Sequence, residues 1–139
     1  MNPHRVLSLL LLLLALVMGG CKTQPPSPQV GGIEFTLETA TRDGKMLFVG
    51  VGGDIDRTVN PDLSVNVGDT VQVVIVNGDG VPHDLAIPDL NVHSALVSTE
   101  AQTTQVIFHP SEAGEFVYYC AVAGHRQMGM EGKLIVIEP

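Results

Sequence analysis

Short β-branched runs separated by glycine- and proline-containing turns fill most of the sequence after residue 32. Several runs alternate apolar and polar residues with a period of two, which is typical of strands with one buried face. The same region shows no convincing amphipathic helix. The pattern predicts about eight strands, at 33–38, 46–51, 63–67, 70–76, 83–87, 103–108, 114–119 and 133–137.

Frequent turns between short strands favour an all-β fold, an antiparallel Greek-key β-sandwich in which each strand buries alternate side chains. Gly68-Asp69 predicts a hairpin that joins 63–67 to 70–76. The weakly patterned segment 90–101 is expected to form a loop with a short helical turn. The chain of 139 residues has the length of one domain, which we place at 33–139.

The first twenty residues have the features of a secretory signal. Arg5 precedes an apolar run that is shorter than the roughly 20 residues of a membrane-spanning helix. The run closes on Met18-Gly19-Gly20-Cys21, which resembles a bacterial lipoprotein processing box with Cys21 as the acylated first residue. The alternative is a plain signal cleaved near Gly20, leaving a free thiol. Residues 21–32 contain several prolines and glycines and are predicted to link a lipid anchor to the domain.

Composition narrows the possible partners and the redox chemistry. The net charge of −8 makes nucleic acid a poor partner, because a phosphate backbone would be repelled. Two cysteines exclude a disulfide-dense miniprotein. If Cys21 carries lipid, Cys120 is the only thiol left in an oxidising, extracytoplasmic compartment. Such a lone cysteine must be buried, reactive or bound to a ligand.

A loop between two predicted strands carries a thiol, an imidazole and a thioether at regular spacing. Four residues separate Cys120 from His125, and four more separate His125 from Met130. Two histidines, a cysteine and a weak axial methionine form the blue-copper arrangement. His83 fits as the second imidazole, because it opens a short strand after a glycine- and proline-containing turn. Two strand ends of this kind can meet at one pole of a sandwich.

These residues stand within longer motifs, namely Pro82-His83-Asp84, Tyr119-Cys120, Gly124-His125 and Gly129-Met130-Glu131-Gly132-Lys133. The combination resembles the cupredoxins, the superfamily of plastocyanin and azurin, and in particular the cupredoxin modules fused to some bacterial copper nitrite reductases. The resemblance covers roughly 44–138. It implies one type 1 copper ion with His83, Cys120 and His125 as equatorial ligands and Met130 as the axial ligand.

Two features depart from the family pattern. Many cupredoxins carry asparagine after the first ligand histidine, where this chain has Asp84. A carboxylate can still accept backbone N–H bonds, so we expect Asp84 to support the ligands from the second shell. Plastocyanins place two residues between the ligand cysteine and histidine, whereas this loop has four.

Each candidate has an ordinary structural alternative. Cys120 could be an inert buried thiol, and His125 could be a capping or surface residue. Met128 competes with Met130 for the axial position. The remaining candidates are interpreted as surface or loop residues: His93, His109, Asp54 and Asp56.

The sequence thus favours a monomeric, lipid-anchored electron carrier of the bacterial cell envelope that shuttles single electrons to and from redox proteins. The resemblance implies that His125 shows its ring edge at the surface as the electron port. Apolar neighbours would form a docking patch there, with Arg126 fixing the orientation: Ala121, Val122, Ala123, Met128 and Met130. A copper-handling protein, a chaperone or store, is the alternative. An enzyme is not expected, because the catalytic copper of nitrite reductases and of multicopper oxidases needs more histidines than this chain offers.

Overall fold

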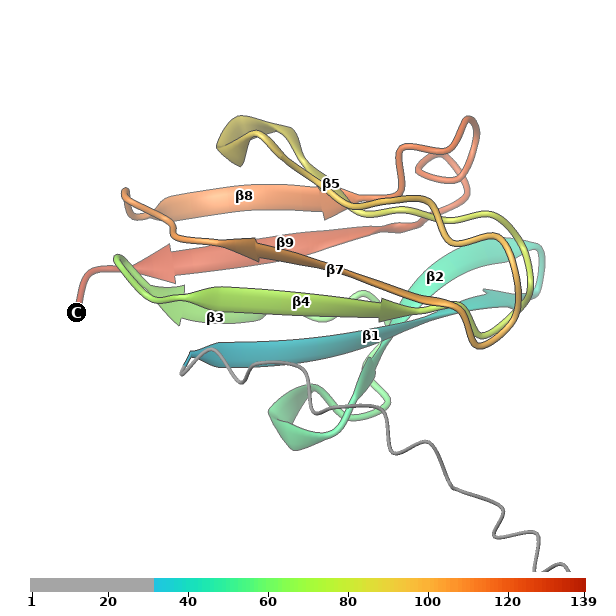
Figure 1. Cartoon of the computed structure of the whole chain (residues 1–139), viewed down its shortest axis with the longest axis horizontal. Coiled ribbons are helices and arrows are strands. Elements are labelled where there is room, and N and C mark those ends of the chain that lie inside the picture. The colour runs from blue at the N-terminus through green and yellow to red at the C-terminus, as the bar shows by residue number, and fades with distance from the viewer. Residues whose placement is uncertain (1–31) are drawn as a thin grey trace, which may run out of the picture.

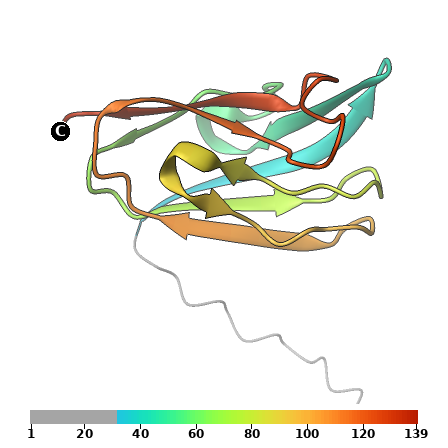
Figure 2. The ribbon, with the colours of Figure 1, turned by 90° about the horizontal axis from the view of Figure 1, so that it is seen from above.

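Two β-sheets face each other in the computed structural model, which describes residues 32–139 (Figures 1 and 2). The predicted signal, Cys21 and all of the predicted linker except Gly32 lie outside the described residues. One sheet has four strands in the order β2 (Lys45–Val51), β1 (Ile33–Arg42), β4 (Val71–Val76) and β7 (Thr103–Phe108). The other has five strands in the order β3 (Leu63–Asn66), β9 (Glu131–Ile137), β8 (Gly114–Tyr119), β5 (Ala86–Ile87) and β6 (Val92–His93). The all-β sandwich is confirmed.

The first hairpin is longer than its alternating pattern indicates. β1 continues to Arg42, which pairs with Lys45 across a two-residue turn. Asp43 and Gly44 both have positive φ, of 51° and 73°, as a type I′ hairpin turn requires. The turn therefore carries strand pairing beyond the predicted end at residue 38.

The predicted hairpin between 63–67 and 70–76 is wrong. β3 belongs to the five-stranded sheet and β4 to the four-stranded sheet, so the Gly68-Asp69 turn crosses from one layer to the other. Both sheets are consequently mixed and not purely antiparallel, because β1 pairs with β4 in parallel and β3 pairs with β9 in parallel. A turn signal fixes a reversal of the chain but does not fix which sheet receives the next strand.

Alternate residues of the strands fill the space between the sheets. Val71, Val73 and Ile75 of β4 are fully buried, and their neighbours in the strand are only half-buried. Phe48 and Tyr118 pack edge to face at the centre, with ring centroids 5.6 Å apart. The Tyr118 hydroxyl donates to the carbonyl of Pro61 at 2.7 Å, so the large aromatic side chain is buried without an unpaired polar atom.

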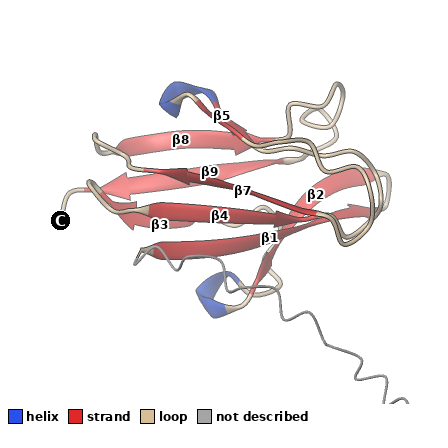
Figure 3. Ribbon diagram, in the orientation of Figure 1, coloured by secondary structure: helices blue, strands red, loops and turns tan. Residues whose placement is uncertain are grey.

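The segment between β4 and β7 is only partly regular. The strand predicted at 83–87 is reduced to β5, and His83 itself forms an isolated bridge with Val97. The helical turn expected within 90–101 begins earlier, as the 3-10 turn η2 (Pro88–Leu90), and the short strand β6 follows it. A second 3-10 turn, η1 (Gly53–Ile55), follows β2, and these two are the helical segments of residues 32–139 (Figure 3).

The loops that carry the candidate site residues lie at one pole of the sandwich. β4 ends there at Val76, β8 ends there at Tyr119, and β9 starts there at Glu131, on the right of Figure 1. Tyr119 pairs with Glu131, so the loop between them starts and ends on hydrogen-bonded strands. Within the part of the chain that the structure describes, no helix is long and apolar enough to cross a membrane.

Candidate metal centre

Three buried donor atoms converge at this pole. The Cys120 sulfur lies 3.4 Å from Nδ1 of His125 and 3.9 Å from Nδ1 of His83. The two Nδ1 atoms are 3.2 Å apart. All three ligand atoms lie within 4.8 Å of one another, and each residue is buried. Among residues 32–139, no other group of three or more histidine, cysteine or acidic side chains comes together in this way.

Backbone hydrogen bonds fold the loop 120–130 so that its donors face one point. The Cys120 N–H donates to the Met130 carbonyl, and the Met130 N–H donates to the His125 carbonyl, each at 3.1 Å. Gly124 and Gly129 have φ of 88° and 103°, a backbone region that side chains with a Cβ rarely adopt. These two glycines therefore let the loop reverse.

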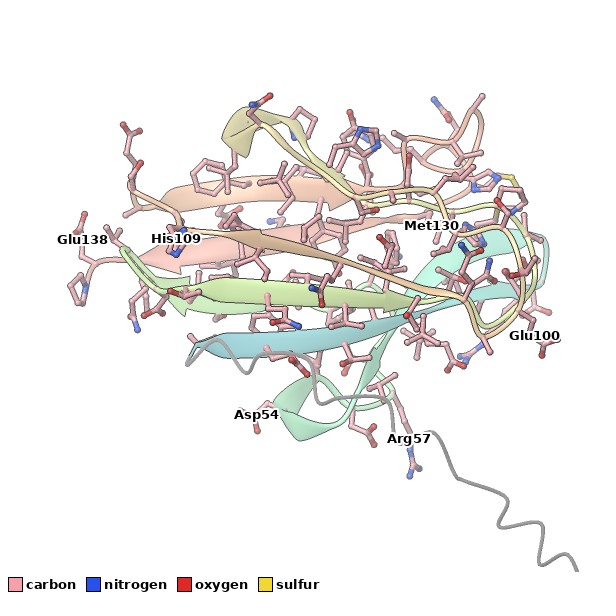
Figure 4. All side chains as sticks on the ribbon, viewed as in Figure 1. Asp54, Arg57, Glu100, His109, Met130 and Glu138 are labelled. Atoms are coloured by element: carbon pink, nitrogen blue, oxygen red, sulfur yellow. The ribbon has the colours of Figure 1, made fainter. Side chains whose placement is uncertain are left out.

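The two methionines of the loop have opposite environments. Met130 is completely buried at the start of β9, at the end of the sandwich that Figure 4 marks with its label. Its backbone contacts both Cys120 and His125. The side chain of Met128 is exposed. Burial thus favours Met130 over Met128 as the thioether of the site.

His83 enters the site from the connection between β4 and β5. Its backbone exchanges two hydrogen bonds with Val97, each of 2.8 Å, which hold this part of the chain against the following loop. The imidazole is fully buried. Nδ1 faces the sulfur, and Nε2 lies 2.9 Å from the Asp79 carboxylate. Asp79 was not among the residues predicted from the sequence, although its position four residues before His83 was the available signal.

Asp84 links the two chain segments that supply the donors. Its Oδ1 accepts a hydrogen bond from the N–H of Ala121, the residue after Cys120, at 2.6 Å. Its Oδ2 lies 2.8 Å from Nε2 of His93. The exposed His93 is therefore more than a solvated surface imidazole, because it holds the carboxylate that supports the ligand loop. In this structure the aspartate accepts a backbone N–H bond, as the sequence analysis expects.

The electrostatics of the pole favour neutral donors in the absence of a metal. Burial raises the pKa of Cys120 to about 11, so the metal-free thiol keeps its proton at neutral pH. Burial and the neighbouring His83 lower the pKa of His125, so its ring is neutral there and its lone pair is free. Metal binding must displace the thiol proton.

The surface over the site carries exposed apolar side chains beside the polar Arg126 and Gln127. Ala121, Ala123 and Met128 are exposed, and Val122 is half-buried against the core. Met130 does not belong to this surface, which corrects the predicted docking patch. His125 is 7% exposed, so only a small part of the residue reaches solvent.

Arg126 is engaged within its own chain. Its Nε donates to Glu131 at 2.7 Å, and its guanidinium carbon lies 4.2 Å from the centroid of the Tyr119 ring. The contact fixes the direction in which the side chain points. The Glu131 carboxylate also offsets the positive charge.

The other candidates lie apart from the donors. His109 is exposed at the opposite end of the sandwich, where Figure 4 labels it. Asp54 belongs to η1, and Asp56 accepts from the Gly52 N–H at 2.9 Å and pairs with Arg57. These acidic residues are loop residues, in agreement with the sequence interpretation.

The donor set decides which metal fits. A thiolate and two imidazoles in close contact, with a buried thioether at the end of the same loop, suit one copper ion in both of its common oxidation states. Hard cations prefer oxygen ligands, and within residues 32–139 no carboxylate oxygen joins the three converging atoms.

A family profile described as the cupredoxin-like domain matches residues 55–136. The chain belongs to this cupredoxin-like family. No curated protein sequence shows significant similarity to the cupredoxin chain.

Solved structures share the fold at low sequence identity. Auracyanin A, a "blue" copper protein from the green photosynthetic bacterium Chloroflexus aurantiacus, is 20% identical with a TM-score of 0.55; the match covers 76% of this chain and 99% of auracyanin A. Rusticyanin from Thiobacillus ferrooxidans is 22% identical with a TM-score of 0.52, covering 74% and 75% of the two chains. Copper nitrite reductase from Nitrosomonas europaea is 20% identical with a TM-score of 0.59, covering 76% of this chain but 41% of the reductase. The match therefore spans nearly all of auracyanin A but less than half of the nitrite reductase.

Proposed function

We propose that this cupredoxin is a type 1 copper protein that carries single electrons in the bacterial cell envelope. The observation that carries the proposal is the convergence of one sulfur and two imidazole nitrogens within 4.8 Å in a buried pole. His83, Cys120 and His125 are the proposed equatorial ligands, and Met130 is the proposed axial ligand. When bound, copper supplies a one-electron Cu(II)/Cu(I) couple.

The protein's own part is to hold the donors in a fixed arrangement. Cys120 and Met130 are tied to each other by a backbone bond, and Asp84 ties the Cys120 segment to the His83 segment. Both neighbouring strands belong to a hydrogen-bonded sheet. Ligand positions fixed in this way change little between two oxidation states, which keeps the reorganisation on electron transfer small.

Burial of the donors supports a carrier over an enzyme or a copper-handling protein. His83, Cys120, His125 and Met130 are all buried, and four protein ligands leave no position for a substrate. Copper-handling proteins need ligands that a recipient protein can reach, and Met128 is the only exposed thioether in the loop. We therefore favour the carrier.

The surface around His125 is the proposed meeting place with a redox partner. Ala121, Ala123 and Met128 offer exposed apolar area close to the ligand histidine. Apolar contacts of this small size suit short-lived complexes. The net charge of −8 favours a partner with a basic surface, which long-range attraction would bring to the carrier. The proposed carrier acts as a monomer.

The proposed location is the extracytoplasmic side of a membrane, with a lipid on Cys21 as the anchor. The signal-like first twenty residues and the proline-rich linker support this placement. The linker separates the anchor from Ile33, the first residue of β1.

The deciding experiment loads the metal-free protein with one equivalent of Cu(II) and records optical and electron paramagnetic resonance spectra. A carrier gives an intense visible thiolate band, reversible reduction and slow loss of copper to a chelator. Cys120→Ser is expected to lose the band, and Ser64→Ala on the exposed face of β3 is the control. A colourless protein that gives up copper readily would contradict the carrier and favour the copper-handling alternative.

A further inference from the structure

A carboxylate contacts the far side of the His83 ring, away from the other donors. Nε2 of His83 lies 2.9 Å from Oδ1 of Asp79, whereas Nδ1 faces the Cys120 sulfur and His125. The His83 side chain is completely buried and that of Asp79 is only 13% exposed. A carboxylate bonded to the second nitrogen of a ligand histidine is a recurring support of metal sites, because it fixes the ring and its tautomer.

Asp79 is itself held from several directions. Its Oδ2 accepts from the Thr41 hydroxyl at 2.7 Å, and its Oδ1 accepts from the Val81 N–H at 3.2 Å and from the Thr39 hydroxyl at 3.4 Å. In each of these contacts the carboxylate accepts, which is the role of an ionised aspartate, and the donors fix it in direction.

The hydroxyl groups that orient Asp79 come from β1, in the opposite sheet from β8 and β9. Thr39 is fully buried, and its hydroxyl also accepts from the Gly78 N–H at 3.2 Å. A chain of contacts thus runs from β1 through Asp79 to His83. The four-stranded sheet therefore takes part in orienting a proposed ligand, although none of its strands carries one.

We propose that Asp79 is a positioning residue of the copper centre, which holds the proton of His83 on Nε2 and lowers the reduction potential with its negative charge. Only the effect on the reduction potential rests on the proposed function; the position of the His83 proton does not. With the proton on Nε2, the Nδ1 lone pair is free to bind a metal. A fixed negative charge near the centre favours Cu(II), which carries one more positive charge than Cu(I).

Asp79 also closes a turn, because its carboxylate accepts from the Val81 N–H two residues later. A purely structural role would change stability but would leave the tautomer of His83 and the potential unchanged. The test must therefore measure those two quantities. Asp79→Asn removes the charge but keeps an oxygen that can accept from Nε2–H, and Asp79→Ala removes both.

Two controls separate charge from packing. Glu115→Gln makes the same change of charge on β8, at the end of the strand away from Cys120, where Glu115 pairs with Lys133 at 2.9 Å. Thr41→Val removes the 2.7 Å hydrogen bond to Oδ2 but keeps the charge of Asp79. The side-chain hydrogen bonds of Glu115 and Thr41 go to Lys133 and Asp79, and not to a proposed ligand.

The experiment measures the potential of the copper-loaded full-length protein and the His83 tautomer of the metal-free protein by ¹⁵N nuclear magnetic resonance at pH 8. Asp79→Asn is expected to shift the Cu(II)/Cu(I) ratio at fixed potential about tenfold toward Cu(I), ~59 mV for one electron, with the visible band retained. Glu115→Gln and Thr41→Val are expected to shift it much less. In the metal-free protein His83 carries its proton on Nε2, and Asp79→Ala gives a mixture of tautomers.

The proposal would be overturned if the reduction potential of Asp79→Asn equalled that of Glu115→Gln. It would also be overturned if Thr41→Val shifted the potential as much as Asp79→Asn does. A wild-type His83 protonated on Nδ1 would also overturn it, without any copper present. If the wild type forms no thiolate band, the carrier function fails, and the tautomer measurement still decides whether Asp79 positions His83.

Discussion

The side-chain amide of Asn60 donates a 2.7 Å hydrogen bond to the backbone carbonyl of Gly129, 69 residues further along the chain. The same amide accepts from the Phe48 N–H at 3.0 Å, and the Asn60 N–H donates to the Phe48 carbonyl. Asn60 therefore ties the Gly129 end of the ligand loop to β2, while Asp84 holds the end near Cys120. The loop is fixed from two directions by residues that hold no metal.

Asn60→Ala is expected to lower the free energy of unfolding of the metal-free protein by about 1–3 kcal/mol, because a partly buried carbonyl and N–H lose their partner. Chemical denaturation measures the change, and the rate of copper loss to a chelator should rise. Asn91→Ala is the matched control, since Asn91 is exposed and also has positive φ, 53° against 48° for Asn60. Equal losses in both variants would assign the effect to backbone conformation and not to the loop contact.

Met130→Leu is expected to keep copper bound and to raise the reduction potential, since the weak axial thioether is removed with little change of volume. The shift should be about tenfold in the Cu(II)/Cu(I) ratio, ~59 mV. The cost in folding stability should stay below about 1.5 kcal/mol for a swap of this kind. Voltammetry of Met128→Leu gives the comparison, and a larger shift there than in Met130→Leu would exchange the two assignments.

Copper uptake is expected to release about one proton per Cu(II) at pH 8. Burial raises the pKa of Cys120 to about 11, so the thiol is protonated at this pH until the metal displaces the proton. The apparent copper affinity should accordingly rise with pH up to that value. An indicator dye in weak buffer measures the release, and Cys120→Ser should release close to none. Wild-type uptake without proton release would show that the thiol is not a ligand.

Asp84→Asn should retain most of the copper-site stability, because an amide oxygen can still accept the Ala121 N–H. Asp84→Ala loses this bond and should weaken the site further, by about 1.5–3 kcal/mol for a bond to a charged acceptor. Thermal unfolding of the copper-loaded variants measures both. His93→Gln keeps a donor for the other carboxylate oxygen and serves as the mild control; a loss as large as that of Asp84→Ala would place the support in His93 instead.

Cys21→Ser should release the protein from membranes into the soluble extracytoplasmic fraction, because the proposed lipid attachment is lost. Fractionation followed by detection of the folded domain measures the outcome. Lys22→Ala is a suitable control beside the attachment site. Membrane retention of the serine variant would mean that Cys21 is not the anchor.

Local patterns were sufficient for most of the strands and for the donor-bearing loop, but not for the length of β1 or for the short strands β5 and β6. Alternation placed the buried residues of β4 and β7, and the spacing from Cys120 to Met130 identified three donors in one loop. The resemblance to cupredoxins and the need for a second nitrogen selected His83. The partition of strands between two sheets did not follow from these patterns, because it depends on packing between distant segments.

The residues that support the ligands were the hardest to predict. Asp79 and Asn60 act through contacts that span many residues, to Thr41 and to Gly129. Their sequence surroundings are those of ordinary turns, in which aspartate and asparagine are common for local reasons. His93 likewise lay in a weakly patterned segment, and only the pairing of β5 with β6 brings it to Asp84.

The position of β1 has a mechanical consequence. β1 lies inside its sheet, with β2 antiparallel on one side and β4 parallel on the other. Force applied at Ile33 along the strand loads two rows of hydrogen bonds, to β4 over Ile33–Glu38 and to β2 over Thr36–Arg42, whereas a strand at the rim of a sheet has only one row. Thr39 and Thr41 sit toward the far end of β1, beyond the residues that would bear the load first. A domain pulled at Ile33 would therefore keep the hydroxyls of Thr39 and Thr41 in contact with Asp79 until β1 separated from its sheet.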